Sequence, residues 1–322
     1  MKKFAILLCS LILILSLTSC SILLPNIDKT IEFIGASVYT DTDKEEDSAT
    51  ETTENGSNQN TQASPSDPDD NNYTEQTPDE IDYVKLINTI TTDTIKACVN
   101  IRTEIQTFTS NSTNLGSGVI FHGEEIKVGN SVVGYHYYVL TNYHVVELPS
   151  NCRYSFTVST YQGNEYNAIP MNKWIYDDAK IELCKKNDLA ILEFECATKL
   201  KVIETAAENP AVNETLISIG QPGGQHNAIT IGTSEDYVDT SLTGGLNMKN
   251  VLLHNAPIDH GNSGGALINT DHKLVGINFA GDFKANGDFK CGYSIPIETV
   301  FQFINDFDSE LYASLMQVPN AA

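Results

Sequence analysis

The sequence predicts an all-β protein built as two antiparallel barrels, with a helix at each end of the folded part. Short segments rich in apolar, β-branched and aromatic residues follow one another over residues 99–295, separated by glycine and asparagine. They do not alternate with helices, as a parallel sheet would require. With 322 residues and 41% hydrophobic content, the chain can bury a large core. Many short strands on a chain of this length favour two barrels with a site between them.

Residues 1–19 predict a secretory signal peptide. Two lysines precede an apolar run over residues 4–17, and small residues then lead to Cys20. This run is shorter than the about 20 residues that a transmembrane helix needs. Residues 17–20 resemble a bacterial lipobox, which implies cleavage before Cys20 and a lipid on its thiol. We therefore expect an extracytoplasmic protein that the lipid on Cys20 anchors to the bacterial cell membrane. The alternative is an uncleaved signal anchor that continues through residues 22–24.

Residues 20–76 predict a low-complexity acidic tether. Over residues 41–80, thirteen acidic residues against one lysine give a net charge of −12, about half of the −23 of the whole chain. Such a composition buries too little apolar surface to offset the entropy lost on ordering. The negative charge also argues against nucleic acid, or an anionic membrane surface, as an electrostatic partner. An acidic binding arm is the alternative interpretation of this segment.

A domain over residues 77–316 follows, and an amphipathic helix over residues 78–94 is expected to open it. Thr77 can cap this helix, Pro78 suits its first position, and Glu80 completes a capping box. Apolar residues recur there at nearly helical spacing, namely Ile81, Val84, Ile87, Ile90 and Ile95. We expect this helix to pack against the barrels.

Strand signals follow this helix. Residues 99–105 alternate between apolar and polar side chains, and residues 116–121 and 135–141 indicate a hairpin. A terminal helix over residues 296–315 is expected to close the domain. Residues 317–322 form a short tail.

The first candidate for chemistry is Ser263, which lies between glycines in the sequence HGNSGGAL of residues 260–267. A serine hydroxyl becomes a good nucleophile only when a base removes its proton, and the oxyanion that follows needs N–H donors. Gly261 can adopt backbone angles closed to other residues, so its N–H and that of Ser263 are expected to form an oxyanion hole. The G-x-S-x-G pattern alone is weak evidence, because it is also ordinary turn chemistry.

Two other segments supply partners for this serine. His144 lies in the β-branched segment VLTNYHVV, and Asp188 follows a predicted loop at residues 185–187 and opens an apolar strand. The order His144, Asp188, Ser263 differs from the serine, acid, histidine order of α/β-hydrolases. Alone, each has an ordinary interpretation as a core histidine, a turn aspartate or a loop serine. Together they predict a triad in which His144 is the general base and Asp188 holds its tautomer and stabilises the imidazolium.

Seven motifs occur in an order that is typical of one family. They are GSGVI (116–120), TNYHVV (141–146), NDLAIL (187–192), SIGQPGG (218–224), GNSGGAL (261–267), VGIN (275–278) and GYSIP (292–296). Over about residues 95–303 the chain resembles a trypsin-like serine protease domain of the HtrA/Deg type. The resemblance implies a chymotrypsin/trypsin-like double six-stranded antiparallel β-barrel with flanking helices. It also implies a serine endopeptidase that acts on unfolded or extended proteins. Because the first helix can contribute to assembly in this family, a homo-oligomer is one expected state.

The resemblance also implies where the substrate pocket lies. The segment before the serine and the strand after it wall the pocket, which assigns Pro257, Ile258, Asn278, Phe279 and Ala280 to it. Pro257 falls where trypsin carries an aspartate, so cleavage after lysine or arginine is disfavoured. An apolar pocket favours a medium-sized aliphatic side chain.

The sequence departs from the family in two places. Because the chain ends soon after the predicted last helix, we expect no downstream peptide-binding PDZ domain, and activation through one is not carried over. Residues 123–130 lengthen a hairpin near His144. We expect no metal and no cofactor, since the remaining histidines lack ligand spacing. Cys98 and Cys184 are expected to be small buried hydrophobic residues.

Two other functions stay open at this point. One is a catalytically weak lipoprotein that uses the protease fold as a binding module or adhesin. The other is an esterase that uses the same three residues. A missing catalytic residue would have favoured the binding module, but His144, Asp188 and Ser263 are all present.

Overall fold

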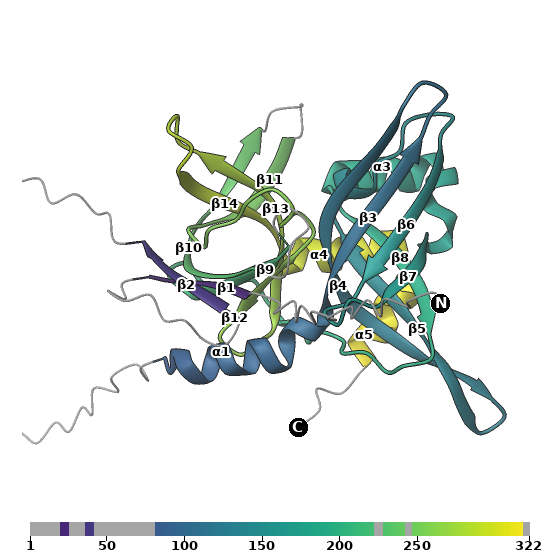
Figure 1. Ribbon diagram of the computed structural model, residues 1–322, viewed down its shortest axis with the longest axis horizontal. Coiled ribbons are helices and arrows are strands. Elements are labelled where there is room, and N and C mark those ends of the chain that lie inside the picture. The colour runs from purple at the N-terminus through teal and green to yellow at the C-terminus, as the bar shows by residue number, and fades with distance from the viewer. Residues whose placement is uncertain (1–19, 26–35, 42–80, 222–227, 242–246, 318–322) are drawn as a thin grey trace, which may run out of the picture.

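The computed structural model describes residues 20–25, 36–41, 81–221, 228–241 and 247–317 (Figure 1). The first two of these ranges are β1 (Cys20–Pro25) and β2 (Ala36–Asp41), which run parallel to each other. β1 also pairs in parallel with β10 (Ala228–Ser241). Both short strands lie within residues 20–76, for which a tether is expected. The expected signal peptide and the Thr77 cap lie outside the described residues.

The first half of the domain is a closed six-stranded barrel in the order β3-β4-β5-β8-β7-β6. Its strands are β3 (Cys98–Gln106), β4 (Asn111–Val128), β5 (Ser131–Thr141), β6 (Arg153–Ser159), β7 (Glu165–Pro170) and β8 (Ala190–Cys196). Side chains alternate along β3, so that Val99, Ile101 and Ile105 are buried in the barrel. The far ends of β4 and β5 extend beyond the barrel as a long hairpin (Figure 1).

The second half is a ring of six strands that closes through the pairing of β10 with β11. The other strands are β9 (Thr215–Gly220), β11 (Asn247–His254), β12 (Ala266–Asn269), β13 (Leu274–Phe283) and β14 (Phe289–Pro296). The pairings within this ring are antiparallel. The predicted double six-stranded antiparallel barrel is therefore confirmed. Buried side chains from both barrels form one main core.

Helices flank the barrels as expected, but their bounds differ from the prediction. The first is α1 (Tyr83–Thr92), followed by η1 (Thr94–Ala97). The expected start at residue 78 is wrong, because residues 81–82 are not helical and Asp82 is the N-cap. Its side chain accepts from the Lys85 N–H at 3.0 Å, which satisfies one of the free donors of the first turn.

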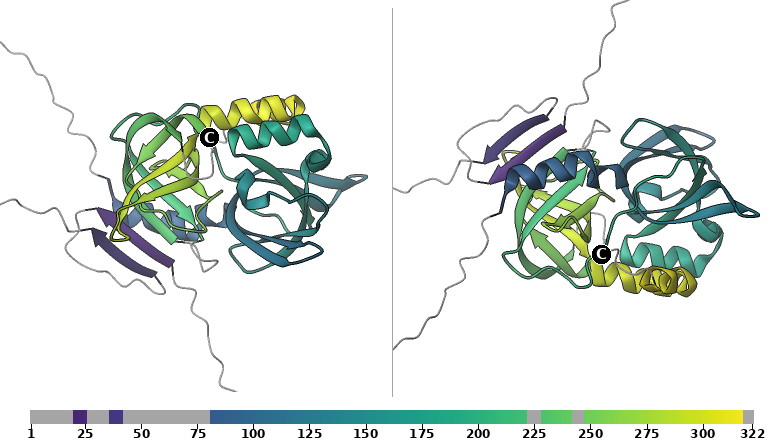
Figure 2. Two further views of the ribbon diagram at one scale, coloured as in Figure 1. Left: turned by 90° about the horizontal axis from the view of Figure 1, so that it is seen from above. Right: turned by 90° about the horizontal axis from the view of Figure 1, so that it is seen from below.

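The C-terminal helix also differs, because the expected single helix is two helices. They are α4 (Ile297–Phe307) and α5 (Ser309–Gln317). The break falls at Asp308, whose extended backbone ends α4 and whose side chain accepts from the N–H groups of Glu310 and Leu311. A capping aspartate thus starts a new helix where the apolar periodicity continues. α4 packs beside α3 (Asp178–Asn187) of the first half (Figure 2).

Two further properties of the described residues bear on earlier expectations. The five cysteines between residues 81 and 317 are free, and the predicted burial of Cys98 and Cys184 is confirmed. Burial raises the pKa of both thiols to about 12, so they are unreactive at neutral pH. None of the helices in the described ranges is long and apolar enough to cross a membrane.

Candidate active site

His144 and Asp188 form a doubly bonded pair in the first barrel. His144 lies on the single-turn helix α2 (Tyr143–Val146), and its Nδ1 is 2.8 Å from Asp188 Oδ2. The other carboxylate oxygen, Oδ1, accepts from the backbone N–H of His144 at 3.0 Å. Because a carboxylate only accepts, this geometry places the imidazole hydrogen on Nδ1 and leaves Nε2 with a free lone pair. The carboxylate is 3% exposed and the imidazole 42%, so the acid is buried while the base stays accessible.

The register of two strands brings this pair together. β5 and β8 run antiparallel, with Thr141 opposite Ala190. His144 follows the end of β5 by three residues, and Asp188 precedes the start of β8 by two. The two side chains therefore leave the same end of the barrel. Asn142 fixes the approach, since its Nδ2 donates to the Asp188 carbonyl at 2.9 Å.

Asp188 also ends a helix that the sequence did not predict. The expected loop at residues 185–187 is wrong, because these residues form the last turn of α3. Asp177 caps the start of that helix, and Asp188 ends it in the left-handed conformation with φ of 47°. The Leu189 N–H donates to the Cys184 carbonyl at 3.1 Å, as in a helix C-terminal motif. The short polar side chain of aspartate tolerates this conformation and delivers its carboxylate to His144.

Ser263 lies in a turn of the second barrel that packs against the start of the His144 segment. Gly264 has φ of 83°, and a Cβ at this position would contact the Ser117 carbonyl, Thr141 Oγ1 and the Asn142 nitrogen. Only glycine therefore allows the turn to approach so closely. The Ser263 hydroxyl donates to the Phe279 carbonyl at 3.5 Å, and within the described residues no hydrogen bond joins it to His144.

In the described part of the chain, the two expected oxyanion donors make no hydrogen bond. Gly261 has φ of 101°, which favours glycine. Among the hydrogen bonds of the described chain, none uses the N–H of Gly261 or of Ser263. The Asn262 N–H between them donates to the Asp259 carbonyl at 3.0 Å, and the Gly265 N–H donates to the Asn262 carbonyl at 2.8 Å. The turn thus uses the N–H groups of Asn262, Gly264 and Gly265 and leaves these two donors available.

The expected pocket residues differ in what their side chains do. Ile258 and Phe279 are buried and apolar, Ile258 lies beside Gly281, and the Phe279 ring is 6.3 Å from the Tyr293 ring. Ala280 is half-buried. Two carbonyls in the same wall accept hydrogen bonds, that of Phe279 from the Ser263 hydroxyl and that of Pro257 from Thr230 Oγ1 at 2.6 Å.

Asn278 supports the serine turn. Its backbone N–H donates to the Gly265 carbonyl at 3.0 Å, and its carbonyl accepts from the Gly264 N–H at 2.9 Å. Its side-chain amide is fully buried and bonds to Ser218 Oγ, Ser294 Oγ and the Ala266 carbonyl at 2.9–3.1 Å. These bonds use the polar atoms of Asn278 within the barrel, so that its side chain holds β13 to its neighbours.

A buried histidine extends this polar cluster. His254 Nε2 is 3.0 Å from Ser294 Oγ, and its side chain has no solvent exposure. Burial lowers the pKa of His254 to about 4, so the ring is neutral at pH 7. His260, expected at the surface, is exposed next to the serine turn. No group of three His, Cys, Asp or Glu side chains in the described part could hold a metal ion.

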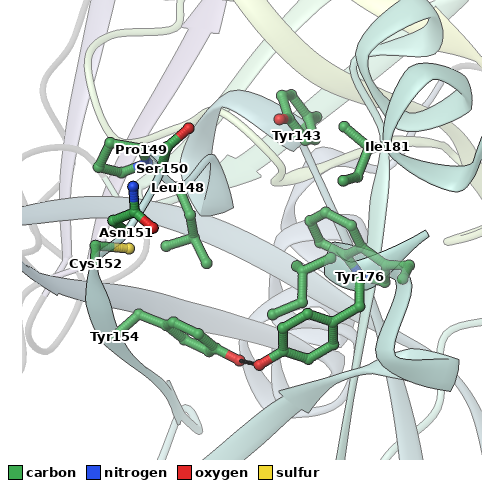
Figure 3. A pocket seen from close by; sticks show the side chains of 11 residues that line it. Tyr143, Leu148, Pro149, Ser150, Asn151, Cys152, Tyr154, Tyr176 and Ile181 are labelled. Carbon is green, nitrogen blue, oxygen red and sulfur yellow. Dashed lines mark hydrogen bonds between the residues drawn. The ribbon is translucent and has the colours of Figure 1, made fainter. Parts of the chain in front are cut away.

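A separate cavity of about 270 Å³ lies beside Tyr143 (Figure 3). Tyr143 of α2, the loop after α2 and the segment around Tyr176 line it. The Tyr154 and Tyr176 hydroxyls are 3.1 Å apart across its lower side (Figure 3). None of the residues expected in the triad, the oxyanion hole or the substrate pocket lines this cavity.

One polar contact of the site was not predicted. The GSGVI motif marks Ser117, but the motif does not show that this residue reaches the serine turn in the other barrel. In the structure the Ser117 N–H donates to the Ser263 carbonyl at 2.8 Å. Only the packing of the two barrels brings these residues, 146 positions apart, into contact.

Two closed six-stranded barrels with a buried Asp188 carboxylate on His144 define a trypsin-like peptidase. The sequence model of the family described as "Trypsin-like peptidase domain" matches residues 116–277, which is half of the chain. The chain therefore belongs to this family. The matched residues include His144, Asp188 and Ser263.

Relatives and a solved structure agree with this assignment. The chain is 36% identical over 169 residues to "Serine protease Do-like HtrA" of Bacillus subtilis (strain 168), covering 51% of this chain and 32% of that protein. It is 32% identical over 200 residues to "Periplasmic pH-dependent serine endoprotease DegQ" of Escherichia coli (strain K12), covering 60% and 38%. The chain thus spans about a third of the length of these relatives. A solved HtrA-type protease with a tripeptide has the same fold, with a TM-score of 0.52 and 22% identity over 70% of this chain and 64% of that one.

Proposed function

We propose that this protein is a serine endopeptidase that hydrolyses peptide bonds in unfolded or extended polypeptides. The observation that carries the proposal is the buried Asp188 carboxylate, which has one oxygen on His144 Nδ1 and the other on the His144 backbone N–H. The bond to Nδ1 orients the imidazole ring, and the bond to the backbone N–H holds the segment that carries it, as a general base acting through Nε2 requires. Membership of the trypsin-like peptidase family and the similarity to serine proteases support the same activity.

In the proposed mechanism, the Ser263 hydroxyl attacks the scissile carbonyl while Nε2 of His144 takes its proton. Rotation about the Ser263 side chain moves the hydroxyl from the Phe279 carbonyl to His144. Such catalytic bonds are often long in ligand-free sites and tighten on substrate binding. His144 then protonates the leaving amine, and an acyl-enzyme remains on Ser263. Water attacks this ester in a second round that uses the same base.

The developing oxyanion is proposed to bind the free N–H groups of Gly261 and Ser263. Each donor of this kind typically contributes about 3 kcal/mol to transition-state stabilisation. Asp188 stabilises the imidazolium that forms in each round and keeps its own negative charge.

The proposed pocket for the side chain before the cleaved bond uses Pro257, Ile258, Phe279 and Ala280, with Asn278 supporting its wall from behind. Ile258 and Phe279 are buried apolar residues, and no carboxylate occurs among the pocket residues. A medium-sized aliphatic side chain is therefore the proposed preference. Cleavage of a peptide library after basic residues would contradict it.

The proposed location is the outer side of the cell membrane. The signal peptide of residues 1–19, the lipid on Cys20 and the acidic segment up to residue 76 would present the protease domain to exported polypeptides. Mass spectrometry of the mature chain tests this, since an acylated Cys20 at the N-terminus is expected. Association of copies through α1 belongs to the same proposal and is tested by the mass in solution.

The activity is tested with the full chain, a fluorophosphonate probe and unfolded casein. We expect labelling and casein cleavage, both of which Ser263→Ala abolishes. Labelling without casein cleavage would replace the proposal with a narrow-specificity protease or an esterase. A folded protein that neither labels nor cleaves would be a binding module with the protease fold.

A further inference from the structure

The Ser117 side chain of the first barrel contacts two segments of the second barrel. Its side chain is buried, and its hydroxyl donates to the Gly261 carbonyl at 2.7 Å. The same oxygen accepts from the Gln221 N–H at 3.0 Å. Since this N–H already supplies a hydrogen to the oxygen, the hydroxyl hydrogen is free to point at Gly261. One side chain on β4 thus joins the end of β9 to the turn that carries Ser263.

The bond to the Gly261 carbonyl fixes a peptide group between the two oxyanion donors. In a trans peptide the C=O and N–H point in opposite directions. The peptide between Gly261 and Asn262 is held at both ends, by the Ser117 hydroxyl on its carbonyl and by the Asp259 carbonyl on its N–H. It therefore cannot rotate without breaking two hydrogen bonds.

This restraint matters more for one donor than for the other. The Ser263 N–H belongs to a peptide whose carbonyl, that of Asn262, accepts from Gly265 within the same turn. Gly261 has no Cβ to restrict its own rotation. In the described chain its N–H makes no hydrogen bond, so its direction depends on the neighbouring peptide that Ser117 holds.

Ser117 is itself held from the histidine side of the site. Its carbonyl accepts from Thr141 Oγ1 at 2.7 Å, and Thr141 precedes His144 by three residues. Its backbone N–H donates to the Ser263 carbonyl at 2.8 Å. Through Ser117, Gly261 of the second barrel is thus held to the first barrel, which carries His144 and Asp188.

We propose that the Ser117 hydroxyl is a positioning group for the oxyanion hole, which acts by holding the Gly261 carbonyl so that the Gly261 N–H faces the reacting carbonyl oxygen. This inference rests on the proposed serine endopeptidase activity. Ser117 is not a catalytic residue, because its hydroxyl contacts Gly261 and Gln221 and touches no reacting atom. Its removal should affect the chemical step and leave substrate binding largely unchanged.

The test compares Ser117→Ala with Ser234→Ala in the full chain. Ser234 is a matched control, because its buried hydroxyl also donates to a backbone carbonyl, that of Ala211, and accepts a backbone N–H, that of Glu214. It lies on β10, and these hydrogen-bond partners lie outside the serine turn. Both variants lose one buried hydroxyl with two backbone partners, so their losses of thermal stability should be similar.

Fluorophosphonate labelling is measured over a range of probe concentrations, which separates the affinity of the probe from the rate of phosphonylation. Casein hydrolysis is measured in parallel as kcat and KM. Loss of a whole oxyanion donor typically slows chemistry by about 10²–10³-fold. Because Ser117→Ala misdirects a donor without deleting it, we expect the phosphonylation rate and kcat to fall by about 10–100-fold. KM and probe affinity should stay within about twofold, and Ser117→Thr, which keeps a hydroxyl, should recover most of the rate.

The outcomes separate this inference from the proposed function. If the wild-type protein reacts and Ser117→Ala reacts as fast as Ser234→Ala, the role of Ser117 is refuted and the protease assignment stands. A well-folded Ser117→Thr that stays as slow as Ser117→Ala would also refute it, because the hydroxyl would then not be the cause. A folded wild-type protein that does not react refutes the protease assignment, and the role of Ser117 in it falls as well.

Discussion

The two halves of the active site are held by different kinds of interaction. In the first barrel, His144 is fixed by a side chain, since the Asp188 carboxylate bonds to its ring and to its backbone. In the second barrel, Ser263 is held by backbone hydrogen bonds, by two glycines with positive φ and by the bonds of Ser117 to the Ser263 and Gly261 carbonyls. A charged side-chain pair thus holds the proposed base, and uncharged groups hold the proposed nucleophile and oxyanion donors. The two halves should therefore fail in different ways when they are mutated.

The largest effect is expected from Asp188→Asn. This substitution removes one of the two acceptors that hold His144 and hardly changes the shape of the side chain. Both carboxylate oxygens of Asp188 accept from N–H donors of His144. An amide has only one oxygen, so its NH₂ must face one of these donors or force the other imidazole tautomer. By analogy with the trypsin triad, kcat should fall by about 10⁴-fold.

Asp177→Asn is a suitable control for this substitution. Asp177 caps the other end of the same helix, where one of its oxygens accepts from two backbone N–H groups. Asparagine caps helices about as well as aspartate. Steady-state kinetics on casein should therefore show nearly unchanged activity in Asp177→Asn. Equal losses in both variants would mean that α3 stability, and not the His144 tautomer, limits the activity.

The second half should be most sensitive at Gly264. In Gly264→Ala the new Cβ would meet the Ser117 carbonyl and Thr141 Oγ1, at a residue whose φ is 83°. The turn must move to relieve these contacts, so fluorophosphonate labelling should slow by about 10²-fold or more, as on loss of a whole oxyanion donor. The first half should survive, because no bond of the His144 and Asp188 pair involves Gly264.

Gly287→Ala separates backbone strain from the close contact. Gly287 also has a positive φ, of 92°, but a Cβ there meets no atom within 4 Å. The substitution should therefore cost only the strain of a left-handed alanine, about 1–2 kcal/mol. We expect a lower Tm and an unchanged rate of fluorophosphonate labelling. If Gly287→Ala and Gly264→Ala proved equal in both measurements, the close approach of the barrels at Gly264 would have no role in the site.

The sequence predicts the strands and the candidate residues better than it predicts the helices. The strands and the three candidate catalytic residues could be read from the sequence, because period-two alternation and short motifs around His144, Asp188 and Ser263 are local signals. The helix before Asp188 was missed, because half of residues 178–187 are charged and the segment lacks a clear apolar face. The break at Asp308 was missed because the apolar spacing continues through it. In both cases an aspartate that caps a helix, Asp177 or Asp308, was the signal that the apolar pattern did not show.

The contacts between the halves could not be predicted from local patterns at all. The Ser117 hydroxyl bonds to Gly261 only because two separate barrels pack with β4 against the serine turn. Asn278 was assigned to the pocket by its position after the serine, but its side chain is used within the barrel. Such roles depend on the register and packing of strands far apart in the chain.

A smaller effect is expected from pH, through His254 in the second barrel. Its folded pKa of about 4 is below the ordinary value near 6.5, so the unfolded chain takes up the proton first as the pH falls. The contribution of neutral His254 to stability is present above about pH 6.5 and is lost as the pH falls towards 4. The free energy of unfolding should then fall by up to about 1.4 kcal/mol per pH unit.

Denaturant unfolding of His254→Gln at pH 7 and pH 5 measures this contribution. Glutamine can bond to Ser294 but does not titrate in this range. Burial also lowers the pKa of His122 and His272, so part of the pH dependence will remain in the variant. The difference between wild type and variant isolates His254. An unchanged pH dependence would mean that the ring is charged, or exposed, in the folded protein.

The smallest effect, and the sharpest comparison, concerns two buried threonines that donate to backbone carbonyls on the two sides. Thr141 Oγ1 donates to Ser117, which holds the oxyanion turn, while Thr103 Oγ1 donates to the Val145 carbonyl on the His144 helix at 2.9 Å. Valine has nearly the same shape, so each substitution removes one hydrogen bond and should cost about 1–3 kcal/mol in unfolding free energy.

The two substitutions should differ in their effect on kcat. Because Asp188 holds His144 independently, Thr103→Val should keep nearly full kcat. Thr141→Val should lower kcat severalfold, because it loosens Ser117 and the turn beyond it. The reverse order of kcat would show that the histidine side is the looser half.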